Sequence, residues 1–186
     1  MPVNTSSICE FGWKAENFIL LSVNTQKYSL QDLKGKNGTV VTFICNHCPY
    51  VISIADRLTY ESEQLKKINV NMIAIMSNDV KSYPEDSFEN MKKFSAKYRF
   101  NFQYLYDSTQ EVAKNYNAVC TPDFFGFNRK LELQYRGRID SKVNNNNNNK
   151  KVRELFNAMK LIADTDIGPK EQNNSFGCSI KWKMNE

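Results

Sequence analysis

Residues Val40–Cys48, with the sequence VVTFICNHC, and the following Pro49 are the most informative part of this 186-residue chain. The β-branched and aromatic residues at 39–44 predict a fully buried strand. Apolar residues with helical spacing follow Pro49, and proline is common in the first turn of a helix. We therefore expect Cys48 where a core strand meets a helix N-terminus. The free N–H groups and the dipole of a helix stabilise a thiolate there, and the thiolate is the reactive form of cysteine.

The composition is that of an ordinary globular protein, with 41% apolar and 24% charged residues, and the length predicts a single domain over residues 1–186. The net charge of +5 is spread along the chain, so we expect no nucleic-acid partner. No apolar run approaches the about 20 residues of a membrane span, and the N-terminus lacks the features of a secretory signal. Five scattered cysteines argue against a secreted disulfide framework and predict a cytoplasmic protein.

Strands and helices are predicted to alternate along the chain. The periodicity predicts strands at 18–23, 27–30, 39–44, 70–76 and 102–106, a hairpin of strands 124–127 and 131–136, and helices at 49–68, 86–98, 109–116 and 152–163. Ser108 and Glu111 form a predicted capping box for the third of these helices. The Asn144–Asn149 run is predicted to be a disordered loop insertion, and residues 164–186 a tail with little periodicity. This order predicts an α/β sandwich with a mixed central sheet.

Residues 18–49, FILLSVNTQKYSLQDLKGKNGTVVTFICNHCP, resemble the opening of the redoxin branch of the thioredoxin superfamily, which holds the AhpC/TSA peroxiredoxin-like proteins. Further matching motifs follow in the same order: SND at 77–79, LYDSTQEVAKNYNA at 105–118, TPDFFGF at 121–127 and YRGRID at 135–140. The tail motif GCSIKWK at 177–183 is similar to the ending of an uncharacterised subgroup of that branch. The resemblance covers nearly the whole chain and implies a thioredoxin-like sandwich.

The resemblance also implies that Cys48 is the attacking cysteine. In thioredoxin-like proteins that cysteine lies five residues after the Phe of the core strand, which here is Phe43. The second cysteine of the usual Cys-x-x-Cys pair would fall at Val51, so the usual resolving partner is missing. Cys45 lies on the strand side of the same turn as Cys48, and residues with this spacing can approach closely enough for a disulfide. Cys45 is therefore one candidate resolving cysteine.

Cys120 is the second candidate. In this superfamily the residues before a cis-proline face the attacking thiol, and Thr121-Pro122 fits that place. The resemblance therefore implies a cis bond there and a substrate site at Thr121, Pro122 and Pro49, where the proline backbone pairs with an extended substrate. Cys178, on a tail expected to be flexible, is a third candidate. The alternative for each of these cysteines is inert packing in the core.

His47 directly precedes Cys48 and is the only histidine of the chain. It could lower the pKa of the neighbouring thiol or carry a proton, or it could be an exposed side chain that is merely adjacent. Zinc binding with the cysteines is a further alternative, but the spacing matches no zinc finger, and the haem-attachment order Cys-x-x-Cys-His is absent. We therefore expect no metal and no cofactor.

Typical peroxiredoxins carry a Thr or Ser three residues before the attacking cysteine and an arginine that faces it. Here Cys45 occupies the first of these places and Thr121-Pro122 the second. We therefore expect thiol–disulfide exchange through Cys48, with a protein or small-molecule disulfide as substrate and a cellular thiol as reductant. The alternatives are a peroxiredoxin-type antioxidant that reduces peroxide through a Cys48 sulfenic acid, and a non-catalytic binding module with the same fold. The oligomeric state stays open.

Overall fold

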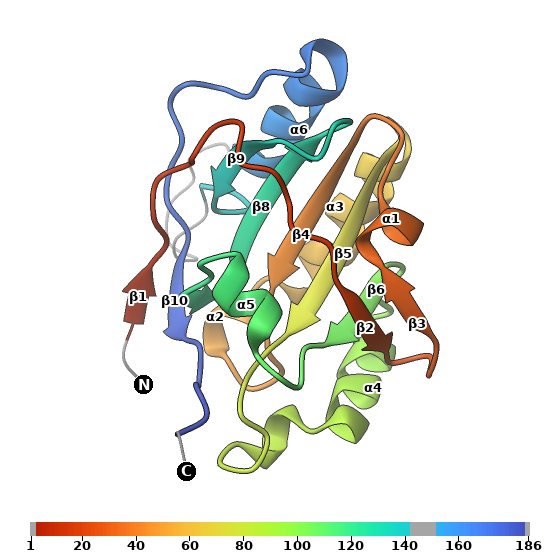
Figure 1. Ribbon diagram of the computed structural model, residues 1–186, viewed down its shortest axis with the longest axis vertical. Coiled ribbons are helices and arrows are strands. Elements are labelled where there is room, and N and C mark those ends of the chain that lie inside the picture. Colours follow the sequence, from red (N-terminus) through yellow and green to blue (C-terminus); the bar gives the residue numbers. More distant parts are fainter. Residues whose placement is uncertain (1–2, 142–151, 185–186) are drawn as a thin grey trace.

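The computed structural model describes residues 3–141 and 152–184, and the Asn144–Asn149 run, predicted to be a disordered loop, lies outside them. Within the described residues a seven-stranded sheet has the order β3-β2-β6-β5-β4-β8-β9 (Figure 1). Its strands are β2 (Ile19–Ser22), β3 (Lys27–Ser29), β4 (Gly38–Phe43), β5 (Val70–Met76), β6 (Gln103–Tyr106), β8 (Asp123–Asn128) and β9 (Leu133–Gly137). β5 pairs parallel with β4 and β6, and the other pairs are antiparallel, so the predicted mixed sheet is confirmed.

The central strand β4 is buried along its whole length. Val40 contributes to one apolar cluster, and Val41 and Phe43 to another on the opposite face. Helices cover both faces: α3 (Ala55–Lys66), α4 (Phe88–Lys97) and α6 (Glu154–Thr165) on one, and α1 (Leu30–Leu33) and α5 (Glu111–Asn115) on the other (Figure 1). A strand buried on both faces favours β-branched and aromatic residues, which is why this stretch is so uniformly apolar. In the described part of the chain, no helix is long and apolar enough to cross a membrane.

The helix predicted over 49–68 is interrupted after one turn. It consists of α2 (Pro49–Ile52) and α3, with Ser53 and Ile54 between them. The Ser53 hydroxyl donates to the Tyr50 carbonyl at 2.9 Å, and the Ile54 N–H donates to Val51 only three residues back. Serine side chains compete for helix carbonyls in this way and bend the helix. The interruption leaves Cys48 before a short helix rather than a long one.

The predicted capping box of Ser108 and Glu111 is not formed. α5 begins after Gln110, whose φ of 66° is left-handed and whose side chain makes no capping bond. Asp107 takes the role of helix cap, since its carboxylate accepts the Ala113 N–H at 3.0 Å. The Gln110 side chain instead binds the C-terminal segment.

The C-terminal segment is structured, so the prediction of a flexible tail is wrong. It contains β10 (Phe176–Ser179), which lies between β1 (Val3–Thr5) and β7 (Cys120–Thr121) in a second sheet and is antiparallel to both (Figure 1). Cys178 is the register partner of Thr121. A strand this short has no periodicity to detect, and its two partners come from distant parts of the chain.

Candidate active site

Cys48 lies between β4 and α2, as predicted. It is the N-cap residue of α2, with an extended backbone, and its carbonyl accepts the Ile52 N–H at 2.9 Å. Pro49 takes the first helical position, where the missing N–H of proline costs no hydrogen bond. The Cys48 side chain is 0% exposed, so a reagent reaches the sulfur only after a local movement.

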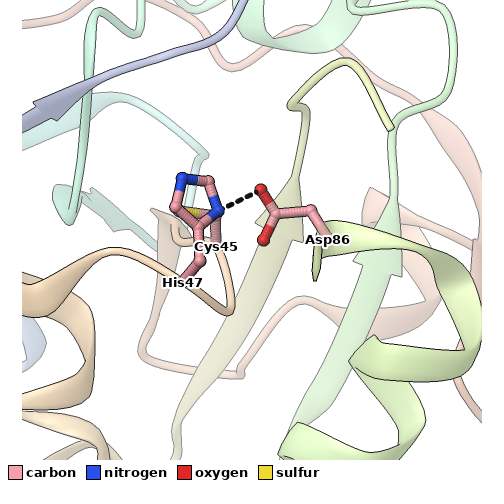
Figure 2. Close-up of side chains that lie close together, drawn as sticks. All are labelled: Cys45, His47 and Asp86. Atoms are coloured by element: carbon pink, nitrogen blue, oxygen red, sulfur yellow. Dashed lines mark ion pairs between the residues drawn. The ribbon is translucent and has the colours of Figure 1, made fainter. Parts of the chain in front are cut away.

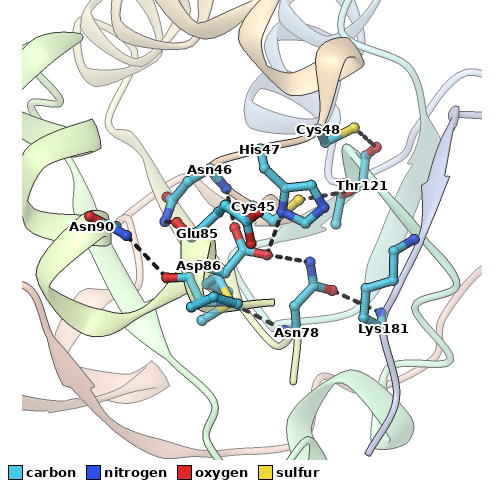
Figure 3. A network of polar contacts seen from close by, with 12 residues as sticks. Cys45, Asn46, His47, Cys48, Asn78, Glu85, Asp86, Asn90, Thr121 and Lys181 are labelled. Carbon is cyan, nitrogen blue, oxygen red and sulfur yellow. Dashed lines mark hydrogen bonds and ion pairs between the residues drawn. The ribbon is translucent and has the colours of Figure 1, made fainter. Parts of the chain in front are cut away.

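Thr121 lies beside both cysteines of the CNHC sequence (Figure 3). The Cys48 thiol donates to the Thr121 carbonyl at 3.1 Å, and Cys45 Sγ lies 3.4 Å from Thr121 Oγ1. The Thr121-Pro122 bond is cis, as the resemblance implies. Of the three candidate substrate residues, Thr121 contacts the proposed attacking thiol directly, and Pro122 and Pro49 are the chain neighbours of Thr121 and Cys48.

Cys178 completes a group of three buried thiols, which we call the thiol cluster: Cys45, Cys48 and Cys178. Both other thiols act on the pKa of Cys48 as hydrogen-bonding neighbours, Cys45 shares Thr121 as a contact with Cys48, and Cys178 is the register partner of Thr121. Cys120 is not part of this arrangement, because its thiol donates to the Pro122 carbonyl at 3.6 Å. Burial also raises the pKa of Cys120 far above its ordinary value. Of the two resolving cysteines predicted first, the structure brings Cys45 but not Cys120 into hydrogen-bond contact with Cys48.

The surroundings of Cys48 lower the pKa of its thiol to about 5. The largest cause is the hydrogen bond from Cys45, and the Cys178 thiol and the backbone N–H groups of Val51 and Cys178 add to it. Burial acts in the opposite direction, because it favours the neutral thiol. The pKa of Cys45 is raised well above its ordinary value and that of Cys178 to about 11. Cys48 is therefore the member of the thiol cluster that ionises first.

His47 is not an exposed neighbour of Cys48. Its side chain is 16% exposed, and its Nδ1 atom lies 2.8 Å from Oδ2 of the buried Asp86 (Figure 2). The ring also stacks on Tyr83, with the centroids 5.6 Å apart. The hydrogen bond to Asp86 raises the pKa of His47 above its ordinary value, while burial opposes this. The imidazolium form is thus stabilised next to the proposed attacking thiol, Cys48.

Asp86 ties the CNHC turn to the loop after β5. It ends the short helix η1 (Pro84–Asp86), and its carboxylate accepts the Asn46 N–H at 2.8 Å and the Asn78 side chain at 2.7 Å (Figure 3). Asn78 in turn accepts the Lys181 N–H of the C-terminal segment at 2.9 Å. Through Asp86, this network fixes the position of the His47 side chain.

Cys45, His47 and Asp86 place one ligand atom each within 4.8 Å of one another. These are atom types that bind zinc. The Asp86 carboxylate already accepts donors from three residues, and the Cys45 thiol contacts Thr121 and Cys48. These contacts account for the closeness of the three side chains, and the expected absence of a metal stays a prediction.

The space next to the site is small. A pocket of about 60 Å³ lies beside Pro122, Tyr50 and Phe176. A larger one of about 840 Å³, which Trp182, Arg136 and Cys9 help to line, does not include any member of the thiol cluster. The smaller pocket includes no member of the thiol cluster either, but Pro122 on its wall directly follows Thr121, the residue that contacts Cys48.

Comparison with known proteins identifies the family. Residues 11–137 match the model of the AhpC/TSA family.

The chain belongs to the AhpC/TSA family.

Solved structures of similar proteins agree with this assignment. An uncharacterized conserved protein from Geobacillus kaustophilus is 41% identical over 100% of this chain and 99% of its own, with a TM-score of 0.92. A hypothetical protein from Sinorhizobium meliloti 1021 is 32% identical over 97% of this chain and 98% of its own, with a TM-score of 0.89. The thioredoxin domain of a thiol-disulfide oxidoreductase from Bacteroides vulgatus shares the fold at 15% identity, with a TM-score of 0.63 over 82% of this chain and 97% of its own. No curated protein matches.

Sequence reasoning missed three parts of the site in this AhpC/TSA protein. Asp86 and Tyr83, the partners of His47, lie between β5 and α4, where the sequence indicated no site residue. The third part is β10, which brings Cys178 to Cys48. The one signal for β10 in the sequence was the tail motif GCSIKWK, in which Gly177 directly precedes Cys178. Glycine in a strand can mark a place where another backbone approaches closely.

Proposed function

We propose that this AhpC/TSA-family protein is a thiol oxidoreductase that acts on disulfides through Cys48. The single observation that carries this proposal is the position of Thr121 against two thiols at the start of α2: the Cys48 thiol lies 3.1 Å from the Thr121 carbonyl and Cys45 Sγ 3.4 Å from Thr121 Oγ1, next to the cis Thr121-Pro122 bond. An attacking thiolate and a second thiol within reach are the two requirements of disulfide exchange.

The reaction begins when the Cys48 thiolate attacks one sulfur of a substrate disulfide. The substrate S–S bond breaks, a mixed disulfide forms on Cys48, and the first substrate thiolate leaves. His47 lies next to Cys48 and is held by Asp86, so its imidazolium can supply the proton that this leaving group takes up.

A second thiol then attacks the Cys48 sulfur. Cys45 loses its proton, forms a disulfide with Cys48 and expels the second substrate thiolate. The substrate has gained two electrons and the protein has lost two, so an external thiol reductant must return the protein to its starting state. Contact between Cys45 and Cys48 supports this assignment, whereas the Cys120 thiol is directed to Pro122.

The test is reduction of a small model disulfide such as hydroxyethyl disulfide in the presence of a thiol reductant. Wild-type protein should turn it over, Cys48→Ser should abolish turnover, and Cys120→Ser should keep most of it. Equal activity of Cys48→Ser and wild type would refute the proposal.

Peroxide is the second candidate substrate, because the enclosed Cys48 favours a small oxidant. Peroxide would convert the Cys48 thiolate to a sulfenic acid and release an alcohol or water, and Cys45 would then displace water from that sulfur. Cys45 stands where a hydroxyl would orient the peroxide, so we expect slow turnover. One lost hydrogen bond to a developing charge costs about two to three decades in rate. Cys45→Thr should therefore speed peroxide consumption, and fast peroxide turnover by the wild type would reverse the order of the two candidates.

A further inference from the structure

We propose that β10 takes the place of a substrate strand at the active site, so that Cys48 acts on small disulfides rather than on protein disulfides, and that Cys178 is a second resolving thiol. This inference rests on the proposed function, and it assigns a substrate class and a role to a segment for which the sequence predicted only a tail with one candidate cysteine.

The backbone edge beside Cys48 is occupied by β10. β7, which contains Thr121, pairs with β10 in antiparallel register, with Cys178 opposite Thr121 and Ser179 opposite Cys120. An extended polypeptide substrate would use this same edge, since strand addition needs free backbone groups next to the cis-proline. β10 of the same chain therefore occupies the edge where a protein substrate was expected to pair. A protein substrate must first displace β10.

The fit of β10 at this edge is close enough to demand a glycine. A Cβ atom on Gly177 would lie 2.0 Å from the Thr121 carbonyl oxygen and 3.1 Å from Pro122 Cδ. On the helix side, Phe176 packs edge-to-face on Tyr50, with the centroids 5.6 Å apart. Strand and helix together leave Cys48 without exposed surface.

The docked strand is held at both ends. Before β10, the Ser175 hydroxyl donates to the Gly137 carbonyl. After β10, the Lys181 carbonyl accepts from the Asp79 N–H and from the Gln110 side chain at 2.8 Å each. A segment anchored on both sides stays over the site in the ground state. A substrate that needs the edge of β7 can react only with the fraction of molecules in which β10 has left that edge, which we call the open fraction.

Cys178 is placed to trap Cys48 from this strand. Cys178 lies opposite Thr121 in the sheet, and the Thr121 carbonyl is 3.1 Å from the Cys48 sulfur; the Cys178 thiol and N–H are also among the groups that lower the pKa of Cys48. After Cys48 has formed a mixed disulfide with a small substrate, the Cys178 thiol loses its proton and attacks the Cys48 sulfur. A Cys48–Cys178 bond forms, the second substrate thiolate leaves, and two thiols of an external reductant later reduce this bond. Cys45 and Cys178 therefore offer two routes to the same two-electron oxidation.

Substrate class is tested with two substrates and three variants. Wild type should reduce hydroxyethyl disulfide efficiently and insulin disulfides poorly. Gly177→Ala, which cannot dock, and Phe176→Ala, which only loses packing, should each raise insulin reduction by about tenfold or more, because the open fraction rises. Ser179→Ala is the control, since among the described residues its hydroxyl hydrogen-bonds only Lys181 of the same segment, and it should behave as wild type.

Disulfide mapping under non-reducing conditions tests the role of Cys178. Oxidised Cys45→Ser should contain a Cys48–Cys178 bond, oxidised Cys178→Ser a Cys45–Cys48 bond, and the double variant no intramolecular bond to Cys48. Wild type that reduces insulin as fast as hydroxyethyl disulfide, or Cys45→Ser without a Cys48–Cys178 bond, would overturn this inference while leaving Cys48 chemistry intact. A wild-type protein that reduces neither hydroxyethyl disulfide nor insulin would instead refute the proposed function.

Discussion

Cys45 and Cys48 stand at the two ends of one turn and have opposite preferences for charge. Cys48 receives donors from two thiols and two N–H groups, whereas Cys45 donates to Cys48 and lies near the Asp86 carboxylate, which disfavours a second negative charge. A shared proton between two sulfurs stabilises one thiolate at the expense of the other. The order of ionisation is therefore a property of the pair rather than of either residue.

The first prediction concerns this pair. The wild-type protein should show thiolate absorbance at neutral pH that disappears as the pH falls through about 5, because the pKa of Cys48 is lowered to that value. Cys45→Ala removes the largest cause and should move the transition to higher pH. Cys9→Ala is the control, since Cys9 is not among the groups that stabilise the Cys48 thiolate. An unchanged transition in Cys45→Ala would show that the thiol donor is not the cause.

A second prediction at this scale concerns His47, which as the only histidine gives a single imidazole signal in NMR spectra of untagged protein. Asp86 raises the pKa of His47, so Asp86→Asn should lower it towards 6.5. The stabilising contribution of this pair is present below pH 6.5 and is lost as the pH rises through the raised pKa of the folded protein. Glu85→Gln is the matched control and should shift the signal less, because Glu85 acts only through space. Equal shifts in both variants would contradict the assigned partner.

At the scale of elements, the C-terminal segment depends on a few polar anchors. Gln110 is 1% exposed, and its side chain donates to the carbonyls of Ser77 at 2.6 Å and Lys181 at 2.8 Å and accepts the Lys183 N–H at 2.8 Å. One buried amide thus joins the end of β5 to the tail. The backbone of Gln110 is left-handed at the start of α5, and its side chain binds the tail instead of capping the N–H groups of that helix.

Gln110→Ala should therefore loosen the tail. Leaving buried partners unsatisfied costs about 1–3 kcal/mol, so amides in residues 176–184 should exchange with deuterium faster, with a smaller effect on peptides from β4 and β5. Gln64→Ala is the control, because the Gln64 side chain is bound only by an exposed Lys67. Unchanged exchange of the tail peptides would show that β10 docks without this anchor.

At the scale of the whole molecule, Arg136 joins segments from three regions. It is buried on β9, contacts Asp123 on β8 at 3.0 Å, and donates to the Asn117 carbonyl at 2.6 Å and to Ser7 at 3.2 Å. Its guanidinium also lies over the Phe125 ring. Burial raises the pKa of Asp123 to about 6 even though Arg136 opposes this, so the carboxylate depends on its partner.

Arg136→Met should lower the free energy of unfolding by about 3–5 kcal/mol, because removing one partner leaves an uncompensated buried charge. Urea denaturation measures this directly. Arg129→Met is the matched control: its ion pair with Asp166 is partly exposed and should contribute about 1 kcal/mol or less. A loss in Arg136→Met no larger than in the control would mean that the buried pair is dispensable.

Local features of the chain were sufficient to predict the central strand, the position of Cys48 and the first turn of its helix. The apolar run at 39–44, the following turn and Pro49 are consecutive in sequence, and their preferences act over a few residues. The order of motifs also led correctly to the fold, since strands alternating with helices admit few arrangements. The cis bond at Thr121-Pro122 came from the family resemblance alone.

The surroundings of Cys48 depend instead on contacts between distant segments. Cys178 comes near Cys48 because β10 pairs with β7, and the partly buried His47 has a partner because Asp86 comes from η1, after β5. Neither contact leaves a periodic signal, because each involves a few polar or sulfur atoms in short elements. Burial makes an unpaired polar group costly, so the folded chain brings such groups together wherever its path allows, and that path is a property of the whole molecule.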